Sequence, residues 1–298
     1  MKRTEVNFKV LSLFIIKIFR FILIFGFCYV ILKPILQYLF YACMSPEDVM
    51  DYTVSSIPKN WSLYNWKKAA ELMNFFGYTG IKSFLLSSSI AFLQMVSSTV
   101  IGYGLSRFEF KGRKLLIVAL FVVMLVPPAV LQLPQYFQFR FFGIGNASVN
   151  LINTLIPNYI LSLFGLGLKQ ALYIFLMRSM FIQLPTDLEN AAYIDGASVY
   201  RTFISVIVPN ARSLMVTIML FAFCWTWTDT TYSTAFYPNI DLVSNQLIRI
   251  NSQLSASGLA EGTTVYAGMM LLMIPMLIFM AFCQKYIVKS IALSGLAN

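Results

Sequence analysis

Few residue types in this chain could do chemistry, and their spacing argues against an enzyme. Histidine is absent from the 298 residues, which removes Ser-His-Asp triads, HExxH zinc helices and imidazole proton relays. No Gly-Lys dipeptide occurs, so the sequence has no phosphate-binding P-loop. The four cysteines form no CxxC pair and lie in or at the ends of apolar runs, which favours buried thiols: Cys28, Cys43, Cys224 and Cys283.

Two charged residues, Asp229 and Lys33, lie within apolar runs. Exposure of a charge to lipid near mid-span costs several kcal/mol, so we expect each to face protein or a water-filled cavity. For Lys33 an alternative is that the side chain snorkels to the outer interface. The aromatic residues Trp225, Trp227 and Tyr232 belong either to the interfacial belt, which is the favoured interpretation, or to a solute path. These five residues are the candidate translocation path.

The segment Leu184–Ser213 is the most polar stretch of the second half, and its pattern predicts a short helix followed by a turn. Pro185 stops the preceding helix, and a cap at Thr186 or Asp187 starts a helix over about 187–194. Acidic residues in the first turn of that helix are favourable next to its positive end.

A reversal and a second helix should follow. Gly196 permits the sharp turn, and a helix over 197–208 is expected to end at Pro209. A helix-turn-helix of this kind, rich in small residues, is suited to docking against another protein.

The composition indicates that these elements sit in a membrane. Hydrophobic residues make up 58% of the chain, charged residues 11%, and the mean hydropathy is +0.73, whereas soluble domains carry about 25% charged residues. Apolar runs of about 20 residues, each long enough to cross a bilayer, recur along the whole chain. The prediction is a single all-α polytopic membrane domain over residues 1–298. The net charge is +10, and the Lys and Arg residues that produce it lie mostly in short segments between the apolar runs. This distribution indicates membrane topology rather than a nucleic-acid-binding surface.

Six spans are predicted, at about 21–41, 81–105, 115–133, 151–181, 213–236 and 265–282. Pro127 and Pro128 should bend the outer end of the third span, and Gly165 and Gly167 interrupt the fourth, whose membrane-crossing part begins near Leu168. A turn is expected at the Gly-Ile-Gly-Asn run of residues 143–146. Most Lys and Arg residues face the cytoplasm if both termini and the loops 107–114 and 183–212 lie there.

A known motif matches the polar segment. The motif is Glu-Ala-Ala, three residues, Gly, nine residues, then Ile-x-Leu-Pro, and the matching positions here are Asn190, Ala191, Ala192, Gly196, Val206, Val208 and Pro209. On this match the chain resembles the permease subunits of bacterial carbohydrate ABC importers, and the run from Ile194 to Ser198 is similar to the maltose-type permeases.

Other segments extend the resemblance. The run Gly102–Lys114 resembles the family's junction after the second span, Trp225–Asp229 resembles its fifth-span motif, and the tail 284–298 resembles its C-terminal extension toward the ATPases. Two positions depart from the pattern. Asn190 replaces the usual glutamate, with Glu189 one residue earlier, and Thr228 replaces an asparagine. The resemblance therefore implies that a neutral hydrogen bond, weaker than a charge-assisted one, replaces the usual ion pair to the ATPase.

The resemblance implies a partner set. It consists of a second, different permease subunit, two ATPase subunits that bind Mg-ATP, and an extracytoplasmic solute-binding protein, in a bacterial cytoplasmic membrane. This chain then has no cofactor of its own, is not an enzyme, and contacts lipid but no nucleic acid. The resemblance assigns ATPase coupling to Glu189, Asn190, Ala191, Ala192, Asp195, Gly196, Arg201 and Pro209.

Two other classes of function stay open. An ion-coupled secondary transporter or channel needs intramembrane acids, and Asp229 is the one candidate that the sequence offers. A membrane-bound lipid or sugar transferase, lacking histidine, needs clustered acids at a membrane face, whereas the acids here are scattered.

Overall fold

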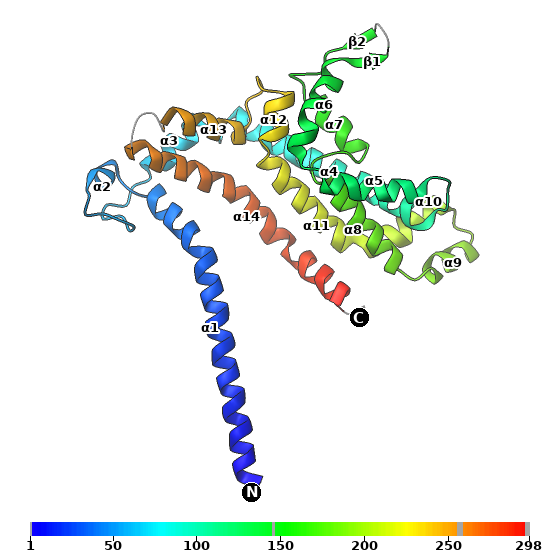
Figure 1. Cartoon of the computed structure of the whole chain (residues 1–298), viewed down its shortest axis with the longest axis horizontal. Coiled ribbons are helices and arrows are strands. Elements are labelled where there is room, and N and C mark those ends of the chain that lie inside the picture. The colour runs from blue at the N-terminus through cyan, green and yellow to red at the C-terminus, as the bar shows by residue number, and fades with distance from the viewer. Residues whose placement is uncertain (1, 145–146, 255–258, 296–298) are drawn as a thin grey trace. The chain divides into compact units, whose positions relative to one another are not determined.

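The protein is mostly helical (Figure 1). The computed structural model describes the backbone of residues 2–144, 147–254 and 259–295 and the side chains of residues 14–143, 147–253 and 262–287. Two compact units are present, Met1–Ala70 with Asn251–Leu271 and Glu71–Ile250 with Leu272–Asn298. The expected turn at 143–146 falls partly outside the described residues, as do the last three residues of the C-terminal tail.

The helices are α1 Lys2–Ala42, α2 Pro46–Met50, α3 Tyr64–Leu72, α4 Tyr78–Arg107, α5 Arg113–Leu125, α6 Pro128–Arg140, α7 Ile156–Leu163, α8 Gln170–Gln183, α9 Asp187–Ile194, α10 Val199–Thr202, the π-helix η1 Phe203–Ile207, α11 Val208–Trp227, α12 Thr231–Phe236, α13 Val243–Leu254 and α14 Leu259–Gly295. Two short strands, β1 Phe142–Ile144 and β2 Ala147–Val149, pair antiparallel.

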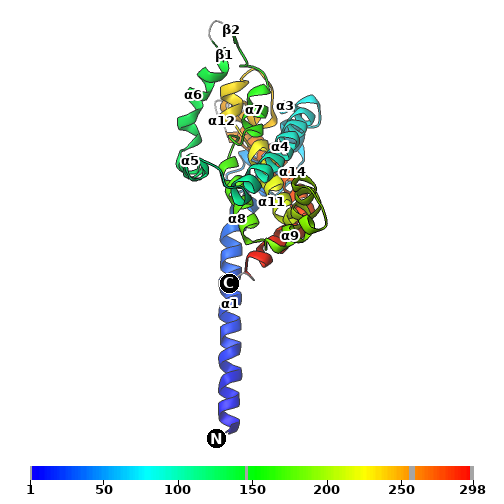
Figure 2. The ribbon, with the colours of Figure 1, turned by 90° about the vertical axis from the view of Figure 1, so that its right-hand side faces the viewer.

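Four helical segments among the described residues are long and apolar enough to cross a membrane. They are Phe14–Ala42, Tyr78–Arg107, Val199–Trp227 and Gly262–Ile287. The pair α5 and α6 brings the number to five if it counts as one broken span, since the two helices bend by 110° at the break between them (Figure 2). That bend lies at Pro127 and Pro128, as predicted.

The predicted fourth span is broken. It divides into α7 and α8, separated by a turn in which Gly165 has φ +80° and Lys169 has φ +59°. Helix α8 has 14 residues, which at about 1.5 Å per residue extend roughly 21 Å. The glycines therefore interrupt this region as the sequence indicated.

The predicted fifth span is shifted, and the prediction that Pro209 ends a helix is wrong. Helix runs without a break from α10 through η1 into α11, and Pro209 lies in the first turn of α11. The helix tolerates proline because it widens into a π-turn, in which the Val208 N–H donates to the Phe203 carbonyl. The Asn210 side chain donates to the Val206 carbonyl at 2.7 Å. The span ends at Trp227, and α12 is a separate helix.

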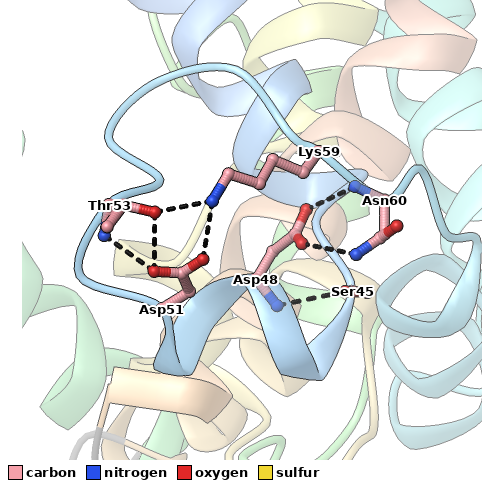
Figure 3. Close-up of polar contacts among 6 residues, drawn as sticks. All are labelled: Ser45, Asp48, Asp51, Thr53, Lys59 and Asn60. Carbon is pink, nitrogen blue, oxygen red and sulfur yellow. Dashed lines mark hydrogen bonds and ion pairs between the residues drawn. The ribbon is translucent and has the colours of Figure 1, made fainter.

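The segment after α1 is held by two carboxylates (Figure 3). Asp48 is buried and accepts hydrogen bonds from the backbone N–H and side-chain amide of Asn60, at 2.8 and 3.0 Å. The Asp51 side chain is 40% exposed and accepts from Lys59 Nζ at 2.7 Å and from the Thr53 N–H and hydroxyl. These bonds, together with an isolated antiparallel bridge between Met44 and Trp61, close the segment between α1 and α3 into a compact loop that contains α2.

In the larger unit α4 packs along α8 and α11 (Figure 1). Gly102 allows the closest approach, because a Cβ at this position would lie 2.7 Å from the Met177 Cβ of α8. Polar side chains also join these elements. Gln170 Nε2 donates to the Ser97 hydroxyl at 2.6 Å and to the Ser162 carbonyl at 2.7 Å, with all three residues buried. Small residues and interhelical hydrogen bonds of this kind hold helices together in lipid, where apolar burial supplies little driving force.

Candidate functional site

Helix α9 forms where the sequence predicted it. Helix α8 ends at Gln183, Leu184 is extended before Pro185, and α9 covers Asp187–Ile194. Thr186 precedes α9 but its side chain makes no capping hydrogen bond, so the acidic first turn is the local feature that favours the start.

The turn after α9 is a Schellman motif. Gly196 has φ +80°, its N–H donates to the Tyr193 carbonyl at 3.0 Å, and the Ala197 N–H donates to the Ala192 carbonyl at 2.9 Å. The positive φ at Gly196 confirms the prediction that this position needs glycine. A Cβ here would meet nothing within 4 Å, so the requirement is conformational and not steric.

An ion pair anchors α9 to the end of α4. Arg107 Nε donates to Glu189 Oε1 at 2.7 Å, and Arg107 Nη2 donates to the Leu184 carbonyl at 2.8 Å. The two side chains are only 12% and 9% exposed. The single arginine therefore holds the end of α4, the α8–α9 connection and the first turn of α9 together.

This geometry separates the predicted coupling residues by their exposure into three groups. Glu189 is buried and engaged within the chain, so its carboxylate is not available to another protein in this conformation. Ala192 is half-buried. The others lie exposed around α9, the turn and the following helix: Asn190, Ala191, Asp195, Gly196, Arg201 and Pro209.

Sequence reasoning missed two large side chains on this surface. Ile194 is 86% exposed and Tyr200 is 74% exposed, on either side of the Gly196 turn. Exposed apolar residues beside a rigid turn are typical of a protein contact surface. The signal was present, because Ile194 opens the Ile-Asp-Gly-Ala-Ser run and Tyr200 follows that run two residues later.

Asp229, the candidate intramembrane acid, is used locally. Its carboxylate accepts from the backbone N–H groups of Thr231, Tyr232 and Ser233, at 3.1, 3.3 and 3.1 Å. It therefore caps the start of α12. The same residue lines a cavity of about 10 Å³ with Gln94 and other side chains, so it faces protein as expected.

The other candidate residues of the translocation path differ in their exposure. Trp227 is buried, its indole N–H donates to the Leu272 carbonyl at 3.0 Å, and its ring stacks on Phe223, so the belt interpretation is wrong for it. Tyr232 is also buried, beside α12, which likewise contradicts a place in the belt. Trp225 is exposed with Lys169 Nζ 5.1 Å from its ring centre. Lys33 is exposed on α1.

Comparison with known proteins identifies the family to which this chain belongs. Residues 94–293 match the family described as binding-protein-dependent transport system inner membrane component. The chain belongs to this family. With its several apolar helices, it is a multi-pass membrane protein. The matched region of the transport family begins within α4 and includes Arg107, Glu189, α9 and Gly196.

Two similar proteins are named as transport permeases. The chain is 29% identical over 198 residues to the diacetylchitobiose uptake system permease protein NgcG of Streptomyces coelicolor, covering 66% of this chain and 62% of that protein. It is 25% identical over 283 residues to the probable ABC transporter permease protein YurM of Bacillus subtilis, covering 91% and 85%.

A solved structure shares the fold over most of the chain. It is the crystal structure of a bacterial ABC transporter involved in the import of the acidic polysaccharide alginate, with a TM-score of 0.69 and 21% identity, covering 91% of this chain and 96% of that chain. The likeness extends beyond the region matched by the family, so the shared fold also includes most of the residues before residue 94.

Proposed function

We propose that this chain is a permease subunit of an ATP-driven oligosaccharide importer, forming half of the translocation pore. Family membership supports the transport role. Relatives named for the uptake of diacetylchitobiose and the transport of trehalose support a saccharide as the solute. The observation that carries the proposal is α9 with its glycine turn, a rigid exposed knob fixed to the transmembrane bundle by Arg107.

In this proposal the membrane topology has six spans. The broken pairs α5 with α6 and α7 with α8 each serve as one span, and the four long apolar helices supply the others. Both termini and α9 lie on the cytoplasmic side of a bacterial cytoplasmic membrane, as the distribution of Lys and Arg favours.

The knob around Gly196 docks an ATPase subunit. Ile194 and Tyr200 supply apolar contact area, and Asn190, Asp195 and Arg201 supply polar contacts around it. ATP binding to the partner subunits displaces the knob, and the Arg107–Glu189 pair transmits that displacement to α4. The ATPases hold Mg-ATP, so this chain needs no cofactor and is not itself an enzyme.

The complete assembly contains further partners. They are a second permease subunit, two ATPase subunits and an extracytoplasmic solute-binding protein. The last is in keeping with a solved alginate transporter that was crystallised with its periplasmic protein bound to an alginate pentasaccharide.

The decisive experiment is co-purification of the chain with the products of neighbouring genes, followed by ATPase assays in proteoliposomes. We expect hydrolysis to rise when a saccharide-loaded binding protein is added and to stay at the basal rate with the unloaded one. Saccharide uptake that follows an ion gradient without ATP would instead establish the secondary transporter.

A topology experiment tests the side of the knob. Ser198 is exposed and caps the helix after the turn, with its hydroxyl accepting from the Arg201 N–H at 3.3 Å. Ser198→Cys should react with a membrane-impermeant maleimide only in inside-out vesicles, relative to the parent protein with its four native cysteines. Labelling from the outside would overturn the orientation and the docking role together.

A further inference from the structure

A cavity of about 580 Å³ opens in the larger unit, away from the knob. Its walls come from one face of α6, the segment that follows β2, and α12 with Pro238. Sites for small molecules typically enclose about 300–1,000 Å³. In the proposed topology this cavity lies on the extracytoplasmic side, because α5 leads from Arg113 at the cytoplasmic face toward α6.

The walls of this outer cavity are rich in groups that bind hydroxyls. Six of its lining residues carry polar side chains: Gln132, Tyr136, Arg140, Asn150, Asn153 and Thr234. Two of the amides are already placed by the chain, since Gln132 Nε2 donates to the Thr231 carbonyl at 3.1 Å and Asn150 Oδ1 accepts from the Ile152 N–H at 2.9 Å. Each placed amide keeps a second polar atom for a ligand.

The charge of the cavity has one sign. Its lining residues, as far as the structure describes them, include Arg140 and no Asp or Glu. Arg140 Nη1 donates to the Tyr136 hydroxyl at 3.2 Å, and its guanidinium lies 5.8 Å from the centre of the Phe141 ring. These contacts orient the guanidinium while leaving most of its five N–H donors for other acceptors.

The geometry points to an outer subsite for a saccharide unit that carries a carboxylate. The Arg140 guanidinium matches a carboxylate in a paired, two-bond geometry that a neutral hydroxyl cannot reproduce. Gln132 and Asn150 then bind the ring hydroxyls, and Tyr136 supplies a flat apolar face. This inference rests on the proposed importer function and narrows its substrate class to acidic oligosaccharides.

The test reads occupancy of the cavity directly, without requiring transport. Asn153 is exposed and lines the cavity, so Asn153→Cys places a thiol at its wall. In vesicles that carry the assembled complex, the rate of modification by an impermeant maleimide is measured with trigalacturonate, with trimannuronate, and with the carboxyl-reduced neutral form of each. The parent protein without Asn153→Cys supplies the background.

We expect at least one of the two uronates to slow modification at least tenfold more than its reduced counterpart. Arg140→Gln should abolish that difference and Arg140→Lys should retain part of it, whereas Lys82→Gln, which removes a cation from α4, should leave it unchanged. Equal protection by the acidic and neutral forms, or protection by none of the four, would overturn the inference. Failure of the proposed function is separate: it appears as ATPase activity that no loaded binding protein stimulates, whatever the labelling shows.

Discussion

Glu189 and Asp229 are carboxylates in the same unit, yet their surroundings differ completely. Glu189 pairs with a charged side chain that lies 82 positions earlier in the sequence, at 2.7 Å. Asp229 accepts hydrogen bonds from three backbone N–H groups that all lie within four residues of it. The first carboxylate joins two distant elements, and the second completes the start of one short helix.

The difference predicts which positions transmit motion. Loss of a long-range ion pair releases α9 from α4, whereas loss of a local cap loosens α12 and leaves the other elements in place. Substitutions at the two sites should therefore differ both in size and in the property that they affect.

The largest effect is expected from Arg107→Ala. It removes the partner of a carboxylate that is 9% exposed and should destabilise the fold by about 3–5 kcal/mol, because an uncompensated buried charge is left behind. Thermal denaturation of the purified protein and ATP-driven uptake measure the two consequences. Lys111→Ala, which removes an exposed cation from the adjoining loop, is the control and should change neither. Equal behaviour of the two variants would contradict the anchoring role of Arg107.

Asp229→Ala should have a smaller effect, of about 0.5–2 kcal/mol, as is typical for loss of a helix cap. Asp229→Asn keeps an acceptor oxygen and should fall between the wild type and the alanine variant. The denaturation midpoint of each variant is the measurement. If Asp229→Ala abolished uptake at unchanged stability, the residue would belong to the transport path and not merely to the cap.

Two substitutions at Gly196 distinguish the effect of backbone strain from the effect on docking. A residue with a Cβ at φ +80° costs about 1–2 kcal/mol, and the surrounding space is open, so Gly196→Ala and Gly196→Arg should destabilise the chain equally. Gly196→Arg alone should reduce recovery of the ATPase in pull-down assays and abolish uptake, because its side chain projects into the docking surface. Normal ATPase recovery and uptake with Gly196→Arg would remove the main support for the importer.

The smallest effect is expected at Asp51, in the loop after α1. The Lys59 hydrogen bond lowers the pKa of this exposed carboxyl below its usual range. Its contribution to stability is therefore complete above the unfolded pKa of about 3.9 and is lost only as the pH falls below it. Between pH 5 and 8 we expect the melting temperatures of wild type and Asp51→Asn to stay parallel and nearly equal, since exposed ion pairs contribute little.

Local signals account for what the sequence could predict. Pro185, the acids of the first turn and Gly196 lie within a dozen residues, and together they predicted the bounds of α9 and the positive φ that follows it. The bend at Pro127 and the break at Gly165 are of the same kind, because each depends on the backbone of one or two residues.

Contacts between residues far apart in the sequence could not be predicted from these local patterns. The partner of Glu189 could not be read from the sequence, since nothing local marks Arg107 as its neighbour. Trp227 was assigned to the membrane belt because most membrane tryptophans lie there, but packing on Phe223 buries it. Pro209 was taken as a helix end because the rule assumes α-helical hydrogen bonds, and the π-turn at η1 removes that assumption.

The contact at Gly102 has a mechanical consequence. With no side chain between the backbones at this point, α4 and α8 cannot slide past one another without a clash at Met177, so they behave as a single lever. Any movement between this helix pair and its neighbours must then occur at the ends of the pair. One end is the α9 knob. The other end is the turn from Gly165 to Lys169 between α7 and α8, where these two residues have positive φ. A push applied at the α9 knob is thus expected to be released as rotation about that turn, more than ten residues away along α8.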